Sequence, residues 1–271
     1  MDAMNAPKGN TSHPRIKKGK MIIATKDSAI AENVDLLLSN SYMARHVIHK
    51  PDYWPRLLEL LYGAGRLRRY AEAVEDIVDK LSFLLLARDQ VLGHEDTSNP
   101  DKRFFVKYFA YTFVFLLKSL LDSLAVFVNT IYTLGFNRGE IDFKRKKFVD
   151  AVKEVDPLLG GTIAAKQQWI VYVSKYRDSL IHQRGLYVGA VPTVPESMTD
   201  PAEIDNFILL EHHYMPTDPR LSSEDVIDGK EVELIKVTDL IGEWLAEVLG
   251  LFDAVLRTFS TRFELVEAEK S

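Results

Sequence analysis

The chain has 271 residues, a net charge of −5 and no cysteine. This length suffices for one large domain or two small ones, each with a real hydrophobic core. The lack of cysteine excludes disulfides and thiolate metal sites, and the N-terminus lacks an apolar signal segment, so we expect a cytoplasmic protein. The negative net charge is not typical of a nucleic-acid-binding protein. Basic runs at 15–20, 66–69 and 144–147 nevertheless remain candidates for contact with a polyanion.

The first hundred residues are predicted to hold a tail and then helices. Residues 1–24 show no periodicity and predict a loose N-terminal tail. Residues 25–100 predict N-terminal helices that pack on the core: one over 27–38, one after Asp52, and a long one that follows Gly65 and ends near Gly93.

The segment from Asp101 to Leu134 is apolar all round, which predicts the central helix of a core. It is rich enough in apolar residues to suggest a membrane span. Lys107, Lys118 and Asp122 interrupt it and leave no uncharged run of about 18 residues, so we expect a buried helix and no membrane contact.

The rest of the chain predicts further helices and one irregular insertion. A short amphipathic helix is expected over 143–154, a turn at 157–161, and a helix from Thr162, its N-cap, to Arg184 before Gly185. Five prolines punctuate the insertion at 186–230, and Phe207–Leu210 with Val232–Leu234 predict a short β-hairpin at its edge. A last helix is expected over 237–263. The predicted fold class is all-α, an antiparallel helical bundle over 101–271 with this insertion.

One arginine lies in the apolar stripe of the helix at 162–184. The stripe consists of Ile163, Ile170, Val173 and Ile181, and Arg177 falls in its middle. A guanidinium keeps its charge, so burying it requires an acidic partner, a ligand phosphate or a second subunit. His182, five residues later, adds a group that titrates near neutral pH.

A polar line along the central helix offers one such acidic partner. Tyr111, Lys118, Asp122 and Asn129 are spaced by seven, four and seven and share a helix face. Two readings stay open. In the first, the line faces solvent and Lys118 pairs with Asp122; in the second, Asp122 neutralises Arg177.

The pattern of Arg177, Asp178 and His182, within the segment YRDSLIHQRG, resembles the catalytic signature of the HEPN (higher eukaryotes and prokaryotes nucleotide-binding) superfamily. The resemblance covers roughly residues 101–271. It implies a HEPN-type bundle, metal-independent RNA cleavage without a cofactor, and a toxin-like or defence role with an antitoxin or regulatory partner. In that chemistry His182 would be the general acid or base, Arg177 would hold the scissile phosphate, and Asp178 would orient the imidazole.

Helix geometry sets a condition on this chemistry. Five residues place Arg177 and His182 roughly 140° apart around an ideal helix, so the two side chains do not converge. Either the last turn unwinds towards Gly185 or a homodimer brings both groups into one cleft, as HEPN proteins commonly do. Arg184, on the same face as Arg177, would then add a second phosphate contact.

Other patterns are weaker. Arg88 and His94 repeat the motif with five residues between them, but Gly93 is expected to end the helix before His94. His46 and His49 lack a carboxylate at the spacing of a zinc site, and His212 and His213 should point to opposite faces of a strand, so no metal site is predicted.

Three functions therefore compete. The first is a HEPN-type endoribonuclease. The second is a non-catalytic HEPN-like module that binds a nucleotide, RNA or a protein partner. The third is a helical interaction protein in which Arg177 is only the structural ion-pair partner of Asp122.

Overall fold

The computed structural model describes residues 21–24, 68–97, 99, 101–182, 188–190, 200, 212–221 and 232–262. Within this part, five helices carry most of the chain: α3 (Arg68–Glu95), α4 (Lys102–Tyr132), α5 (Lys146–Val155), α6 (Pro157–His182) and α9 (Val237–Arg262). Most of the expected helices are confirmed. The helices expected at 27–38 and after Asp52, the pair His46 and His49, and Phe207–Leu210 lie outside the described residues.

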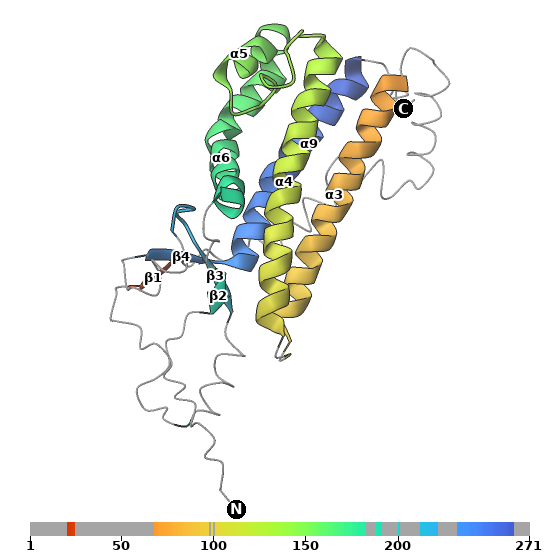
Figure 1. Ribbon diagram of the computed structural model, residues 1–271. Helices are drawn as coiled ribbons and strands as arrows, with labels where there is room; N and C mark the ends of the chain where they lie inside the picture. Colours follow the sequence, from red (N-terminus) through yellow and green to blue (C-terminus); the bar gives the residue numbers. More distant parts are fainter. Residues whose placement is uncertain are drawn as a thin grey trace, which may run out of the picture.

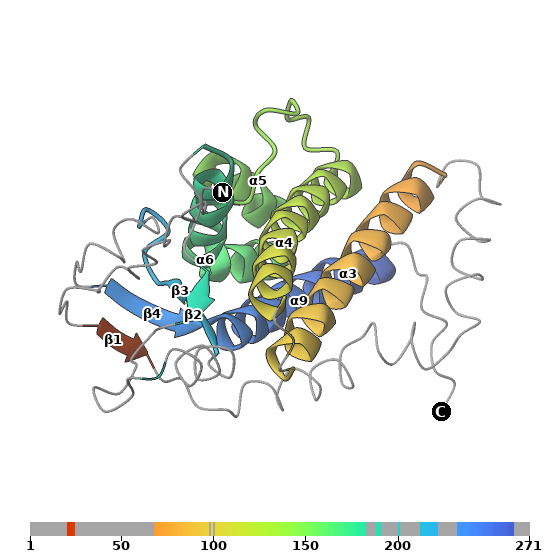
Figure 2. The same ribbon diagram turned by 60° about the horizontal axis from the view of Figure 1, so that its bottom comes forward.

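The helices pack lengthwise around α4, which lies between α3 and α6 with α9 behind it (Figures 1 and 2). The core combines apolar side chains from all five helices. The largest side chains that are fully buried are Trp244, Tyr176, Phe113, Phe127, Phe143, Phe148, Phe252 and Phe259. The part of the chain that the structure describes is therefore mainly helical, as predicted.

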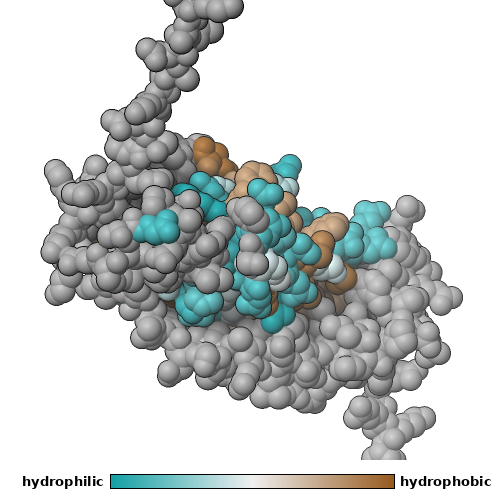
Figure 3. All heavy atoms as spheres, turned by 90° about the horizontal axis from the view of Figure 1, so that it is seen from below, coloured by the Kyte–Doolittle hydropathy of each residue, from teal (hydrophilic) through white to brown (hydrophobic). Residues whose placement is uncertain are grey.

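A small sheet lies at the end of the molecule where α3 and α4 are joined (Figure 1). Its strand order is β1-β4-β3-β2, formed by Met21–Ala24, Val232–Lys236, His213–Pro216 and Gly189–Ala190. β1 runs parallel to β4, whereas the other pairs are antiparallel. Figure 3 views this end of the molecule, where hydrophilic residues surround a few hydrophobic patches.

The sheet corrects two expectations. Residues 21–24, predicted to end a loose tail, form a strand, because four successive backbone groups pair with Val232–Ile235. The expected antiparallel partner of Val232–Leu234 also differs: Tyr214, Met215 and Pro216 of β3 pair with β4 in the described region. The strand predicted at Val232–Leu234 is confirmed within β4, and its pairing was decided by long-range contacts that a local pattern does not encode.

α4 is long and apolar enough to cross a bilayer by length and composition, the only such helix among the described residues. In the structure, 56% of its most apolar stretch is buried inside the protein. Phe113, Leu117, Leu124 and Phe127 have no exposed surface. This is the burial expected of a core helix.

Two helix ends bear on the site described below. α4 ends at Thr133, which has a positive φ of 54°, and Gly135 follows with φ 75°. The Asn129 side chain accepts a hydrogen bond from the Phe136 backbone and so fixes the loop that leads to α5. α6 begins at Pro157 rather than Thr162, because Asp156 caps it by accepting a hydrogen bond from Leu159 N at 2.9 Å. The expected turn at 157–161 is therefore the first turn of the helix.

Candidate phosphate-binding cleft

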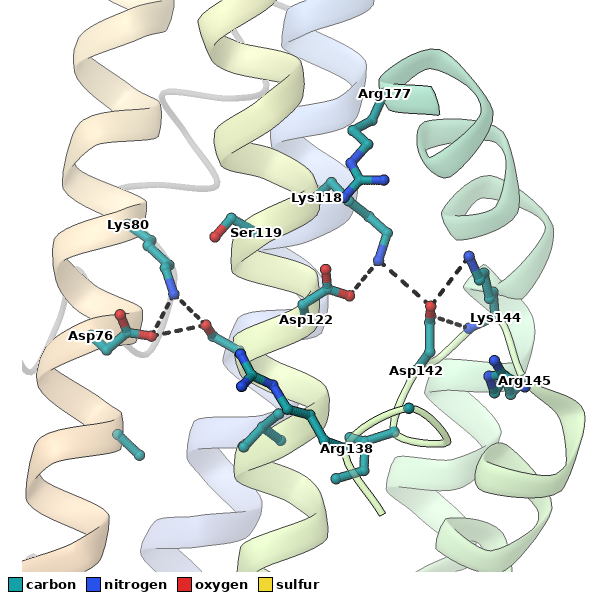
Figure 4. Close-up of a pocket in the computed structure, with 15 residues that line it drawn as sticks. Asp76, Lys80, Lys118, Ser119, Asp122, Arg138, Asp142, Lys144, Arg145 and Arg177 are labelled. Carbon is teal, nitrogen blue, oxygen red and sulfur yellow. Dashed lines mark hydrogen bonds and ion pairs between the residues drawn. The ribbon is translucent and has the colours of Figure 1, made fainter. Parts of the chain in front are cut away.

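A cleft of about 620 Å³ opens between α3, α4, the α4–α5 loop and α6 (Figure 4). This volume lies in the range of small-molecule binding sites. Six basic side chains line the cleft against three acidic ones. The basic residues are Lys80, Lys118, Arg138, Lys144, Arg145 and Arg177, and the acidic residues are Asp76, Asp122 and Asp142. The cleft is therefore cationic although the whole chain is acidic.

Lys118 lies in the middle of the cleft wall. Its side chain is only 8% exposed, and its ammonium contacts the carboxylates of Asp122 and Asp142, the latter at 3.6 Å. The predicted Lys118–Asp122 pair is confirmed, whereas the predicted solvent-facing line is wrong at Lys118, which is buried. The Lys118–Asp142 ion pair joins the α4–α5 loop to α4, and within the loop Asp142 also accepts a hydrogen bond from the Lys144 backbone at 2.9 Å.

The other two members of the polar line have different surroundings. Asn129 caps the end of α4, as described above. Tyr111 is half-buried, and burial raises the pKa of its hydroxyl to about 12. The even spacing along α4 therefore does not define a single functional strip.

Arg177 reaches into the cleft from α6 (Figure 4). Its side chain is 38% exposed, and its Nη1 donates to Asp178 Oδ1 at 2.8 Å. The predicted ion pair between Arg177 and Asp122 is not formed, because Lys118, one helical turn away on α4, takes the Asp122 carboxylate. The guanidinium thus has one half-exposed carboxylate partner and remains open to an anion in the cleft.

The opposite face of α6 fixes the position of Arg177. Tyr172, Tyr176 and Ser179 donate hydrogen bonds to backbone carbonyls at the end of β3 and just after it, at Thr217, Pro216 and Pro219 respectively. Trp244 of α9 packs edge-on against both tyrosines, with ring centroids 6.0 and 5.0 Å apart. Burial first, and then the neighbouring Tyr172, raises the pKa of Tyr176 well above its ordinary value, so its hydroxyl stays a donor. These contacts prevent α6 from rotating about its axis.

Of the remaining predicted site residues, the described part of the chain brings only Asp178 into contact with Arg177. α6 is helical through His182, so no unwinding between Arg177 and His182 supports the first of the two alternatives, and the two residues stay roughly 140° apart around the helix. Asp178 is half-exposed and its carboxylate pairs with Arg177. Ile181, assigned to the apolar stripe, is 46% exposed, and Arg184 lies outside the described residues.

The second copy of the motif lies away from the cleft. α3 continues past Gly93 to Glu95, so the expected helix end is wrong. His94 stacks on Phe105, with centroids 4.5 Å apart, and Arg88 lies 3.5 Å from Asp89. Neither residue lines the cleft, and His94 serves packing between α3 and α4.

A buried ionic cluster was not predicted. Glu95 at the end of α3 is 3% exposed, accepts hydrogen bonds from His213 N at 3.0 Å and from the His213 ring at 2.8 Å, and lies 3.6 Å from Lys102 Nζ. Burial alone would raise the pKa of Glu95, but the hydrogen bonds and charge of His213, together with Lys102, hold it below its usual value. His212 also lies 3.6 Å from Glu95, so the two histidines approach one carboxylate instead of facing apart.

Comparisons of the chain with protein families, with curated proteins and with solved structures found no match. Within the described residues, no group of three or more His, Asp or Glu side chains is placed to hold a metal ion.

Proposed function

We propose that this protein is a HEPN-type endoribonuclease that binds an RNA phosphate at Arg177. The observation that carries the proposal is the setting of Arg177: a half-exposed guanidinium, held rigidly by α6, at the edge of a cleft with six basic and three acidic side chains. A planar guanidinium can bind a phosphate through two parallel hydrogen bonds.

The proposed reaction uses two groups of the motif, the imidazole of His182 and the guanidinium of Arg177. His182 would remove the proton from the ribose 2′-hydroxyl, and the 2′-oxygen would then attack phosphorus. The bond from phosphorus to the 5′-oxygen breaks, and that oxygen takes a proton from water, which leaves a 2′,3′-cyclic phosphate and a 5′-hydroxyl. Arg177 would stabilise the negative charge that develops on the phosphate oxygens.

A homodimer would bring the two groups together. Within one chain, positions 177 and 182 lie on different faces of an unbroken helix. A two-fold axis near the end of α6 would instead place His182 of one copy beside Arg177 of the other. The oligomeric state is therefore part of the proposed mechanism.

A non-catalytic module that binds RNA or a nucleotide is the alternative. It is favoured by the direction of the cleft, which runs from Arg177 towards the α4–α5 loop, whereas His182 lies about 7.5 Å further along α6 in the opposite direction. The third function, in which Arg177 only neutralises Asp122, is contradicted by the pairing of Asp122 with Lys118.

Cleavage of single-stranded RNA in EDTA tests the proposal. We expect Arg177→Ala and His182→Ala each to lower the cleavage rate by at least about 100-fold, because each removes one contribution to the transition state. Arg257→Ala is the matched control: this exposed arginine pairs with Asp253 at 3.2 Å on α9, outside the cleft, and its loss should leave the rate unchanged. Gel analysis of end-labelled RNA gives the rate and identifies the cyclic phosphate.

The possible results separate the two functions. RNA binding that Arg177→Ala abolishes, in a parent protein that cleaves no RNA, would establish the binding module and reject the nuclease. A parent that neither binds nor cleaves RNA would reject both.

Mixing the two inactive variants tests the dimer. If each site combines Arg177 of one chain with His182 of the other, a mixed dimer of Arg177→Ala and His182→Ala has one intact site. After exchange of subunits, half the dimers are mixed and half their sites are intact, so activity should return to roughly a quarter of the parent value. An active protein whose two variants give no rescue on mixing, although subunit exchange is demonstrated by labelled chains, would contradict the shared site.

A further inference from the structure

We propose that Arg138 and Arg145 form a second phosphate subsite at the far end of the cleft, so that the ligand spans the cleft with at least two phosphates. This inference rests on the proposed function and extends it: the substrate class is an oligonucleotide rather than a mononucleotide. Neither arginine belongs to the motif that carries the resemblance to HEPN proteins.

Ion pairing singles out these two arginines among the basic residues of the cleft. Lys80 pairs with Asp76 at 2.6 Å, Lys144 with Asp142 at 3.5 Å, Lys118 with two carboxylates, and Arg177 with Asp178. Arg138 and Arg145 have no carboxylate at ion-pair distance among the residues that the structure describes. They are the cations of the cleft that a ligand phosphate could neutralise without first displacing a described partner.

The position of the two arginines gives the length of the ligand. Figure 4 shows Arg177 at one end of the cleft, the Lys118 ammonium between Asp122 and Asp142 in its middle, and Arg138 and Arg145 on opposite sides of the other end. The α4 residues that line the cleft run from Lys118 to Val126, which corresponds to about 12 Å of helix axis. A nucleic-acid strand advances ~3.4 Å per nucleotide in a duplex and further when extended, so more than one phosphate would pass along the cleft.

The middle of the cleft differs chemically from its ends. There Lys118 is neutralised by Asp122 and Asp142, and the hydroxyls of Ser119 and Ser123 also line the wall. The carboxylates disfavour a phosphate, and both carboxylates and hydroxyls can accept hydrogen bonds from ribose hydroxyls. Along the cleft, a cationic end, a polar middle and a second cationic end therefore follow one another. This order matches that of phosphate, ribose and phosphate along one strand.

The loop that carries both arginines is held in place. Asn129 binds the backbone of Phe136, and Asp142 accepts hydrogen bonds from the backbones of Lys144 and Arg145, at 2.9 Å each. Both arginine side chains are exposed, so their replacement should not disturb the core. A preordered subsite needs less ordering when the ligand binds.

The test measures binding in the His182→Ala background, in which the RNA stays intact. The probe is a fluorescent uridine oligonucleotide of about ten residues, titrated at about 50 to 200 mM salt. We expect Arg138→Ala/Arg145→Ala to weaken binding at least about fivefold at the lower salt. The slope of log K against log salt should fall by about 0.7, since the subsite holds one phosphate and each single-strand phosphate contact contributes about 0.7. Competition by uridine monophosphate, which would occupy only the Arg177 end, should give the same Kd in both proteins.

The control is Arg220→Ala/Arg257→Ala, which removes two exposed arginines outside the cleft and gives the same net charge. An equal loss of affinity in this control would assign the effect to net charge and overturn the subsite. The subsite is also overturned if Arg177→Ala weakens oligonucleotide binding while the Arg138/Arg145 variant does not, although the proposed function then stands. If Arg177→Ala has no effect, the proposed function itself fails.

Discussion

Replacement of Glu95 by alanine is expected to lower the free energy of unfolding by about 3–5 kcal/mol, because it removes one partner of a buried ionic cluster. The Lys102 ammonium and the His213 ring are each 3% exposed and would remain in the interior without their carboxylate. The backbone N–H of His213 would also lose its acceptor, and an unsatisfied buried donor adds to the loss. Urea unfolding followed by circular dichroism measures the change.

The cluster connects three secondary-structure elements, and for this reason the loss of a single carboxylate is expected to lower the stability of the fold. Glu95 ends α3, Lys102 begins α4, and His213 begins β3. Asp96→Ala is the matched control: this exposed acidic side chain is next to Glu95, and its removal should change stability by no more than about 0.5 kcal/mol. A Glu95→Ala protein as stable as this control would show that the cluster does not stabilise the fold. The double variant Glu95→Leu/Lys102→Met should lose less stability than Glu95→Ala, since it leaves no unpaired lysine.

The pH dependence of the free energy of unfolding gives an independent check on the same cluster. The pKa of Glu95 is held below its ordinary value of 4.5 in the folded chain, so the carboxylate contributes stability above pH 4.5. That contribution is lost as the pH falls below 4.5 through the folded pKa, because the proton binds the unfolded chain more tightly. We expect Glu95→Gln to be less stable than the parent at neutral pH and the two proteins to converge in acid. A constant difference across this range would contradict the assigned pKa shift.

The helices could be predicted because their apolar positions recur at helical spacing over long segments. In the final helix the apolar residues at this spacing are all buried: Leu240, Trp244, Val248, Leu251, Val255 and Phe259. Helix ends were less predictable, since they depend on single contacts. Because Asp156 caps α6, this helix begins five residues before Thr162. At the other end of the core, α3 continues past Gly93 to Glu95, the residue at the centre of the ionic cluster. The sequence did contain a signal for the true start of α6: Asp156 is a capping residue, and Pro157 after it is favoured at the first position of a helix.

The candidate site could be predicted only in part. The sequence identified Arg177 and the Lys118–Asp122 pair, both of which line the cleft. It also marked the basic run at 144–147 without showing where that run lies. Arg138 and Asp142 were not predicted, because they reach the cleft through the path of the α4–α5 loop. Glu95 and His213 lie 118 positions apart in the sequence, and no local pattern relates them.

The contact between α5 and α6 gives the second large expected effect. A Cβ atom on Gly160 would lie 2.3 Å from the Cα atom of Lys153 and 2.6 Å from its nitrogen, so α6 meets the backbone of α5 where only glycine fits. Backbone atoms cannot rotate away as a side chain could. We therefore expect Gly160→Ala to displace α5 and to lower the free energy of unfolding by about 1–3 kcal/mol or more.

Gly161→Ala provides a control one residue along the same helix. Its Cβ would have no neighbour within 4 Å, so alanine should leave stability unchanged or raise it by about 0.5–1 kcal/mol through helix propensity. The site adds a second readout, because Arg145 lies immediately before α5 and α5 packs on α6, which carries Arg177. Displacement of α5 should weaken oligonucleotide binding in Gly160→Ala under conditions where the variant remains folded. Equal stability and binding in the two alanine variants would show that the close approach of α5 and α6 neither stabilises the fold nor positions the second phosphate subsite.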